Sequence, residues 1–485
     1  MAENEGERIL AGKNPEAVFR FFEEICAVPH GSYHTKALSD RLVAFAQARG
    51  LACRQDGANN VVIRKEAAPG YENAPTVMLQ GHIDMVAETA PDCGKDMLTE
   101  GLDLFIDGDC IGARGTTLGA DNGIAVAMML ALLDGKEFAH PALECVFTAD
   151  EEVGMLGAKA LDTSDLKSGI LINLDSEDEK TFTVGCAGSA QVSCTFRGDR
   201  EPFGKEVLKL TVGGLRGGHS GEQIHEGKAN ANLVMGRILY KIAESAPIRL
   251  IGITGGTKTN AIARECTALV AAEDAEAVRA SVSEIAGKIK NEFRLPDPDL
   301  YVNVLPCASG TLPFDKKTTD GIVGFLYTVP NGVQTMSADV PGLVQTSLSL
   351  GIIREEDGGV MLSTMIRSGI NSQRDDLIGK IRCLAHTFGA CTEVSSITGA
   401  WEYRSESALR RAVSDTYRAE YGEEPLFTAI HAGVECGVFS EKIADLDCIS
   451  FGPDLIGIHT PDERLPISST ARTWHFLLRL LERLK

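Results

Sequence analysis

The chain has 485 residues, more than the about 250–300 residues at which a single hydrophobic core stops growing, so we expect two domains or more. Its 68 acidic residues outnumber its 47 basic residues, and the net charge of −21 argues against nucleic acid and anionic membranes as partners. Hydrophobic residues make up 44% of the chain, which is typical of a globular α/β protein.

The first residues, MAENEGERILAGKNPEAVF, are polar and acidic and lack the apolar core of a signal peptide. No apolar run reaches the roughly 18 residues that a transmembrane helix needs. The 13 cysteines contain no CxxC pair and indicate neither a disulfide framework nor a cysteine zinc site. We therefore expect a cytoplasmic protein in a reducing compartment.

The N-terminal third of the sequence predicts a sheet covered by helices. Residues 15–51 are expected to form two amphipathic helices, and from about residue 60 to 175 short β runs alternate with helices. The strands are expected at 60–63, 76–80, 143–149 and 169–175, and the clearest helix at 122–134.

The middle of the sequence contains an order of strands and helices that recurs, which predicts two related α+β units. The first unit would have strands at 207–212, 249–254, 266–271 and 300–305 and helices at 229–243 and 275–293. The second would have helices at 319–328 and 372–388 and strands at 345–352, 359–366 and 391–397.

After Trp401 the α/β pattern returns, with a helix at 405–421 and a strand at 447–451. The predicted fold class is therefore α/β, a mixed sheet flanked by helices with an inserted α+β domain. Residues 1–187 and 401–485 would form the discontinuous sheet domain, and residues 188–400 the insertion.

Histidine and acidic residues follow the predicted strands. In GHIDMV, His82 and Asp84 come directly after a strand, and their even spacing places them on one side of an extended chain. Other such positions are Asp121 before a helix, Glu151 and Glu152 after the strand at 143–149, Asp175 at the end of the next strand, and His459 in a late loop.

Each of these residues alone has an ordinary explanation. Asp121 would cap its helix, Glu151 and Glu152 would form an exposed acidic turn, and His459 would be a loop histidine. Taken together, two histidines and four carboxylates at the strand ends of one sheet would concentrate negative charge at the edge where such sheets bind ligands. Metal cations usually offset such a charge.

Several motifs together resemble those of the M20 family of dinuclear zinc metallopeptidases. These are GHIDMV, TLGADNGIAVAMMLALL, FTADEEVGMLGA, LINLDSE, GGHSG and IGIHTPDE, while CAVPHGSYHT and HAGVECGVF are similar to its aminoacyl-histidine (Xaa-His) dipeptidase subgroup. The resemblance covers nearly the whole chain. It implies a zinc-peptidase-like catalytic domain with an inserted lid, and hydrolysis of short peptides with a free N-terminus, with Xaa-His dipeptides as expected substrates.

The resemblance implies two Zn²⁺ ions per chain. His82, Asp121 and Asp175 would bind one ion, and Asp121, Glu152 and His459 the other, with Asp121 shared between them. Nitrogen and oxygen ligands without cysteine suit a catalytic zinc site. Mn²⁺ or Co²⁺ would also suit these ligands.

For catalysis the resemblance implies three further roles. Asp84 would orient the ligand histidine, Glu151 would be the general base, and His219 of the lid would stabilise the tetrahedral oxyanion. Because the insertion is long enough for two units, His219 would serve its own chain. A homodimer is compatible with this arrangement, but the active site would not require one.

The expected partner is a small dipeptide substrate. Arg367 would bind its C-terminal carboxylate, although an exposed strand-end arginine is the alternative, and Glu435 would bind its α-amino group. His431 and Asn260 would also line the site. Two other functions stay open: an M20-like deacylase or carboxypeptidase, which needs no ammonium-binding carboxylate, and a non-catalytic metal-binding protein, which would be expected to lose Glu151.

Overall fold

The computed structural model describes residues 8–485, and the chain divides into two compact units. Unit 1 comprises Met1–Gly185, Tyr403–Ala429 and Val434–Lys485, and unit 2 comprises Cys186–Glu402 and Ile430–Gly433. The return of four residues, Ile430–Gly433, to unit 2 was not expected from the sequence. The assignment of the two segments as catalytic domain and lid stays a prediction.

Unit 1 contains an eight-stranded sheet with the order β1-β2-β6-β3-β7-β21-β8-β20. The central pairs β6–β3, β3–β7 and β7–β21 are parallel, and the pairs β1–β2, β2–β6 and β21–β8 are antiparallel, so the sheet is mixed as predicted. In chain order the strands are β1 (Ala52–Gln55), β2 (Val61–Lys65), β3 (Val77–His82), β6 (Leu143–Thr148), β7 (Ile170–Asn173), β8 (Thr181–Cys186), β20 (Leu426–Ile430) and β21 (Asp447–Ser450). Strand β21, which comes late in the sequence, lies between β7 and β8.

Helices flank this sheet, and α3 (Ala120–Asp134) is the most buried of them. Every residue from Ala120 to Leu133 except Asp121 is buried, because α3 packs against both α1 and β3. A helix that is apolar all round is typical of such an interior position. The other helices of unit 1 are α1 (Glu16–Cys26), α2 (Lys36–Ala48), α4 (Leu156–Ala160), α9 (Ala408–Tyr421), α10 (Glu435–Lys442) and α11 (Ile467–Arg483).

A second, three-stranded sheet in unit 1 has the order β22-β5-β4 and connects two distant parts of the sequence. Its strands are β4 (Leu104–Asp107), β5 (Cys110–Ala113) and β22 (Leu465–Pro466). Because β22 directly precedes α11, this small sheet fixes the start of the C-terminal helix.

Unit 2 contains one nine-stranded antiparallel sheet, with the order β15-β10-β14-β12-β17-β18-β9-β19 and β16 beside β17. Its strands are β9 (Gly188–Phe196), β10 (Glu206–Gly213), β12 (Ile248–Gly255), β14 (Cys266–Ala272), β15 (Tyr301–Cys307), β16 (Gly332–Met336), β17 (Val344–Glu356), β18 (Gly359–Ser368) and β19 (Cys391–Thr398). A two-stranded ladder, β11 (Gly218–His219) with β13 (Ala261–Ile262), lies outside this sheet.

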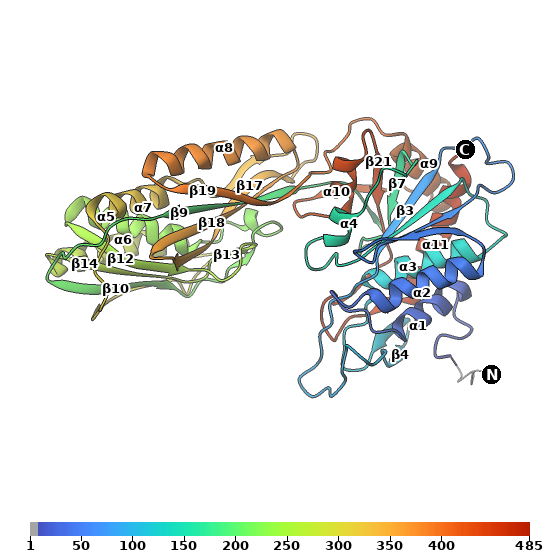
Figure 1. Ribbon diagram of the computed structural model, residues 1–485, viewed down its shortest axis with the longest axis horizontal. Helices are drawn as coiled ribbons and strands as arrows, with labels where there is room; N and C mark the ends of the chain where they lie inside the picture. Colours follow the sequence, from blue (N-terminus) through green and yellow to red (C-terminus); the bar gives the residue numbers. More distant parts are fainter. Residues whose placement is uncertain (1–7) are drawn as a thin grey trace. The chain divides into compact units, whose positions relative to one another are not determined.

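One face of the large sheet in unit 2 is covered by helices (Figure 1). Alternate residues of β9 are buried, from Ala190 to Phe196, while those between them are partly exposed. The covering helices are α5 (Ala231–Ser245), α6 (Ala275–Glu292), α7 (Lys316–Thr328) and α8 (Asn371–Phe388). Both halves of the segment share this one sheet and one hydrophobic core, and their relatedness stays a prediction.

The predicted helices and strands are all present, with ends shifted by a few residues. Several elements were missed, among them β9, whose sequence GSAQVSCTF alternates small and polar residues, and α10 and α11 near the C-terminus. Asp121 was expected in the turn before a helix; α3 begins one residue earlier, yet the backbone of Asp121 is non-helical, with φ −81° and ψ 103°. Within residues 8–485 no helix has the length and hydrophobicity to span a membrane.

Candidate functional site

Three neighbouring parallel strands of unit 1 bring the first site residues together. In the ladder of β3, β6 and β7, His82 pairs with Thr148 and Gln80 pairs with Asn173. The carboxyl ends of these strands therefore meet at one edge, where open α/β sheets bind ligands. His82 ends β3, the Glu151-Glu152 turn follows β6, and Asp175 follows β7, so residues distant in sequence lie close together.

The carboxylate of Asp121 lies between two histidines. Its Oδ1 is 3.1 Å from Nε2 of His82, which is also 3.6 Å from Oδ1 of Asp175. Its Oδ2 is 3.2 Å from Nε2 of His459, which is also 2.9 Å from Oε1 of Glu152. The five predicted metal ligands thus form two groups that share Asp121, with one of its oxygens facing each group.

The charges of these two groups fit divalent cations. Burial lowers the pKa of His82, but Asp175 and Asp121 outweigh it and raise that pKa well above its ordinary value. The hydrogen bonds that His459 donates to the carboxylates of Asp121 and Glu152 raise the pKa of His459 to about 10. Without a cation, the carboxylates thus favour the protonated form of both imidazoles. Bound cations would replace those protons and use the imidazole nitrogens as ligands.

Asp84 is buried and contacts both the ligand histidine and the glutamate turn. Its Oδ1 lies 3.4 Å from Nδ1 of His82, and its main-chain oxygen lies 3.0 Å from the same nitrogen. The carboxylate also accepts the backbone N–H groups of Glu151 at 2.9 Å and Glu152 at 3.3 Å. Ser32, from the CAVPHGSYHT motif, donates its hydroxyl to Oδ2 at 2.9 Å. Asp84 therefore fixes the imidazole and the turn relative to each other.

Glu435 lies at the start of α10 and is fully buried. Its Oε2 accepts hydrogen bonds from Gln80 and from the hydroxyl of Thr148, at 2.7 Å for the latter, whereas Oε1 is buried without a hydrogen-bond partner in the described part of the chain. Burial is the main cause that raises the pKa of Glu435 to about 7. A substrate group would have to meet this carboxylate at Oε1.

The predicted substrate residues of unit 2 gather around Arg367. Nη2 of Arg367 lies 3.4 Å from Nε2 of His219, and Nε2 of His431 lies 2.7 Å from the hydroxyl of Ser347. Asn260 precedes β13, and its main-chain oxygen accepts the N–H of Ser220, the residue after His219. The ladder of β11 with β13 thus places His219 beside Asn260.

Arg367 is 9% exposed, and no acidic side chain in residues 8–485 forms an ion pair with it. Its Nε also lacks a hydrogen-bond partner there. Burial lowers the pKa of Arg367, since the charged form loses hydration. A buried guanidinium without a carboxylate is costly, and an anionic ligand would compensate it.

Both ring nitrogens of His219 face hydrogen-bond donors. The backbone N–H of Glu222 donates to Nδ1 at 3.2 Å, and Nη2 of Arg367, which can only donate, lies 3.4 Å from Nε2. Burial and the positive charge of Arg367 lower the pKa of His219 and favour the neutral ring. An acceptor oxygen beside Nη2 of Arg367 would take a hydrogen bond from the guanidinium and, in the Nε2–H tautomer, a second one from His219.

Three residues near these groups were not identified from the sequence. Ser32 contacts Asp84, Ser347 contacts His431, and the carboxylate of Glu463 accepts the backbone N–H group of Asp121. The available signal was proximity alone: Glu463 stands in the same IGIHTPDE motif as His459.

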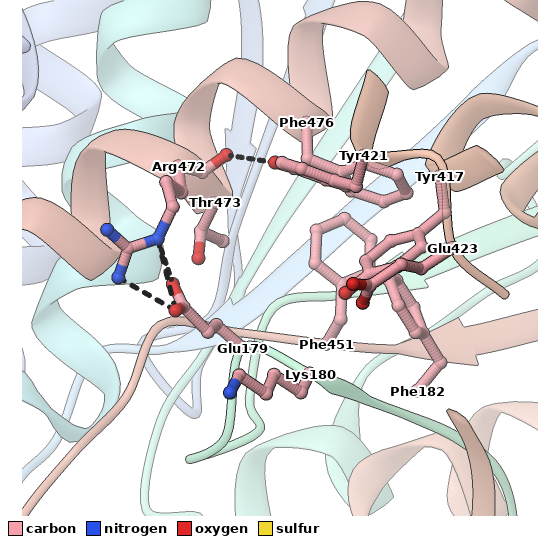
Figure 2. Close-up of a pocket in the computed structure, with 10 residues that line it drawn as sticks. All are labelled: Glu179, Lys180, Phe182, Tyr417, Tyr421, Glu423, Phe451, Arg472, Thr473 and Phe476. Carbon is pink, nitrogen blue, oxygen red and sulfur yellow. Dashed lines mark hydrogen bonds and ion pairs between the residues drawn. The ribbon is translucent and has the colours of Figure 1, made fainter. Parts of the chain in front are cut away.

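A separate hollow of about 270 Å³ lies in unit 1 between α9 and α11 (Figure 2). Half of its ten lining residues are aromatic, and Arg472 forms an ion pair with Glu179 at 2.7 Å on one side. The aromatic residues are Phe182, Tyr417, Tyr421, Phe451 and Phe476. None of the predicted site residues lines this hollow.

Comparisons with known proteins agree with the motifs. The profile of peptidase family M20/M25/M40 matches residues 78–483. The cytosol non-specific dipeptidase of Escherichia coli (strain K12) is 37% identical over 477 residues, which cover 98% of each chain. The crystal structure of aminoacylhistidine dipeptidase from Vibrio alginolyticus has a TM-score of 0.90 and 37% identity, covering 98% of this chain and 97% of that one. Aminopeptidase PepT from Bacillus cereus shares the fold, with a TM-score of 0.58 and 16% identity over 97% of this chain and 99% of the other.

Proposed function

The chain belongs to peptidase family M20, and from this premise we propose that it is a metallo-dipeptidase that hydrolyses short peptides with a free N-terminus, Xaa-His dipeptides among them. The observation that carries the proposal is the position of Asp121, with one oxygen toward His82 and the other toward His459. Full-length relatives named as dipeptidases support the substrate class.

The cofactor would be a pair of divalent cations, Zn²⁺ by the choice of ligands, with Mn²⁺ or Co²⁺ as substitutes. His82, Asp121 and Asp175 would hold one ion, and Asp121, Glu152 and His459 the other. When bound, such a pair activates a water molecule and polarises the scissile carbonyl.

The chain's own proton transfer is assigned to Glu151. It would take a proton from the attacking water and pass it to the leaving amine. Among the described residues Glu151 forms no ion pair, so its carboxylate is not committed to another side chain. Asp84 holds the backbone of Glu151 at 2.9 Å and thereby limits the positions of this carboxylate.

Substrate binding and oxyanion stabilisation are assigned to residues of unit 2. Arg367 would bind the C-terminal carboxylate, and the Nε2–H of His219 would donate to the oxyanion of the tetrahedral intermediate. The guanidinium of Arg367, which has no ion pair among the described residues, and the position of His219 beside it support these roles. His431, held by Ser347, and Asn260 would complete the contacts, and Glu435 would receive the α-amino group.

A panel of substrates tests the reaction. Metal-loaded protein is expected to hydrolyse dipeptides with a free N-terminus, including Xaa-His dipeptides. It should hydrolyse N-acetylated amino acids at least about 10²-fold more slowly, because acetylation leaves the carboxylate of Glu435 unpaired. Release of free amino acids is measured by chromatography. Faster turnover of N-acetyl amino acids than of dipeptides would instead identify a deacylase.

The role of Arg367 is tested by the C-terminus of the substrate. Arg367→Ala is expected to raise KM for dipeptides about 10²-fold, because charged hydrogen bonds contribute roughly 1.5–3 kcal/mol, and to leave dipeptide amides nearly unaffected. Arg367→Lys should recover part of the loss, since lysine lacks the planar fork. Arg354→Ala, at an exposed arginine of β17, is the control. An equal loss for acids and amides would exclude carboxylate binding.

The proposal assigns the protein to the cytoplasm, because its Escherichia coli relative is named a cytosol dipeptidase. A small dipeptide is the only partner that the reaction requires. A homodimer is compatible with this reaction, and no step assigned above needs a residue from a second chain.

A further inference from the structure

Glu463 is a buried carboxylate that binds four consecutive backbone N–H groups. Its Oε2 accepts from Leu118 at 2.8 Å and Gly119 at 3.1 Å, and its Oε1 accepts from Ala120 at 2.9 Å and Asp121 at 3.3 Å. It is 2% exposed, and no basic side chain of residues 8–485 forms an ion pair with it. Its carboxylate therefore binds the main chain of the segment that leads into α3.

The main chain that Glu463 holds is irregular. Gly119 has a left-handed backbone with φ 65°, and Asp121 and Asn122 have non-helical angles. The first N–H groups of a helix have no partner within the helix, and a carboxylate at this end is favourable. Because Asp121 belongs to this segment, the direction of its carboxylate depends on how firmly the segment is held.

Glu463 also belongs to the loop that carries His459: its main chain closes the turn, and its side chain ties this loop to residues 118–121. The N–H of Glu463 donates to the main-chain oxygen of Thr460 at 3.0 Å, and this closes the turn after His459, whose backbone is left-handed with φ 60°. The side chain of His459 is 43% exposed, so packing alone constrains it weakly. Glu463 thus contacts the main chain on both sides of the 3.2 Å pair between Asp121 and His459.

We infer that Glu463 is a positioning residue that sets the separation of Asp121 and His459 and thereby the affinity of the cation proposed between them. This inference rests on the proposed function. His82 ends a buried strand, and Asp175 follows a neighbouring strand of the same sheet. The sheet therefore holds His82 and Asp175 independently of Glu463, so one ligand of the His82 group, Asp121, depends on Glu463, whereas in the His459 group both Asp121 and His459 do. Loss of Glu463 weakens the His459 cation more than the His82 cation.

The test is a titration of metal-free protein with Zn²⁺ in competition with a chromophoric chelator. Glu463→Gln preserves the shape of the side chain but turns an amide NH₂ toward backbone donors. We expect the dissociation constant of one cation to rise by about 10–100-fold, which is the usual cost of losing a group that supports a ligand. The dissociation constant of the other cation should rise clearly less. Glu463→Asp, which keeps both oxygens on a shorter side chain, is expected to give an intermediate value and serves if Glu463→Gln does not fold.

The matched control is Glu144→Gln. Glu144 is also 2% exposed and accepts the N–H groups of Lys167 at 3.0 Å and Ser168 at 3.1 Å, but it lies near the opposite end of β6 from the glutamate turn. Thermal unfolding of the metal-free proteins measures the general loss of stability in both variants. The control is expected to keep both wild-type dissociation constants.

Three results would decide against the inference. Wild-type affinities in Glu463→Gln would overturn it, and so would an equal weakening of both cations, because Glu463 would then have no particular link to the His459 group. A wild-type protein that binds fewer than two cations would overturn the proposed metal site itself, which the titration of the unmodified chain reveals before any variant is compared.

Discussion

Removal of the metal ions is expected to abolish dipeptide hydrolysis, and Zn²⁺ is expected to restore it at close to two ions per chain. The reason is the charge of the site: Asp121, Glu152 and Asp175 meet around two imidazoles, and no lysine or arginine of the described chain pairs with these three carboxylates. Without cations the carboxylates favour protonated histidines, and the ligand side chains pair with one another. The ions that would activate the water molecule are then absent. Activity and metal content are measured together after dialysis against a chelator.

The same reasoning gives a pH dependence for metal binding. The pKa of His459 is raised to about 10, so at pH 7 this imidazole is protonated in the metal-free protein. A cation must displace that proton, and the apparent affinity for the cation should therefore increase as the pH rises from 7 toward 10.

The control for the metal-removal experiment is chelator that is already saturated with zinc, which should not inhibit the enzyme. Full activity in protein without metal would exclude the metallo-dipeptidase reaction.

Substitutions of the adjacent residues Glu151 and Glu152 are expected to have different effects on kcat and on metal content. Glu151→Ala should retain both ions and lose about 10²–10⁴-fold in kcat, the usual contribution of a general base. Glu152→Ala should lose metal as well, because Oε1 of Glu152 lies 2.9 Å from Nε2 of His459, whereas Glu151 pairs with neither site histidine. Metal content by mass spectrometry and kcat by steady-state kinetics separate the two variants.

Each glutamate variant serves as the control for the other, since the two side chains are neighbours on one turn. An equal loss of metal from both would contradict the division of roles. A normal kcat in Glu151→Ala with both ions bound would exclude Glu151 as the base.

Much of the fold and the site could be predicted because both depend on patterns within short segments. Apolar runs predicted the strands, and the residues after them were recognisable because parallel strands end at a common edge, as they do for His82 and Asp175. The amphipathic helices of both units were also predicted from a pattern within a short segment, the spacing of their apolar residues. The roles given to the site residues stay predictions, although the structure brings all five proposed metal ligands together.

The features that escaped prediction depend on contacts between distant segments. Glu463 binds backbone groups more than 340 positions earlier in the chain, and backbone groups leave no mark in a sequence. The pairing of Ser347 with His431 arises only because Ile430–Gly433 returns to unit 2. Strand β9 alternates small and polar residues and carries too few large apolar side chains to stand out.

The late position of β21 in the sequence has a consequence for synthesis on the ribosome. Strand β21 lies between β7 and β8, so the sheet of unit 1 remains divided until residue 450 has been made. By then all of the inserted unit has been made, both Cys186–Glu402 and its four later residues Ile430–Gly433. Because domains generally fold as units during synthesis, the inserted unit is expected to fold first, and the sheet that carries the proposed metal ligands is completed last.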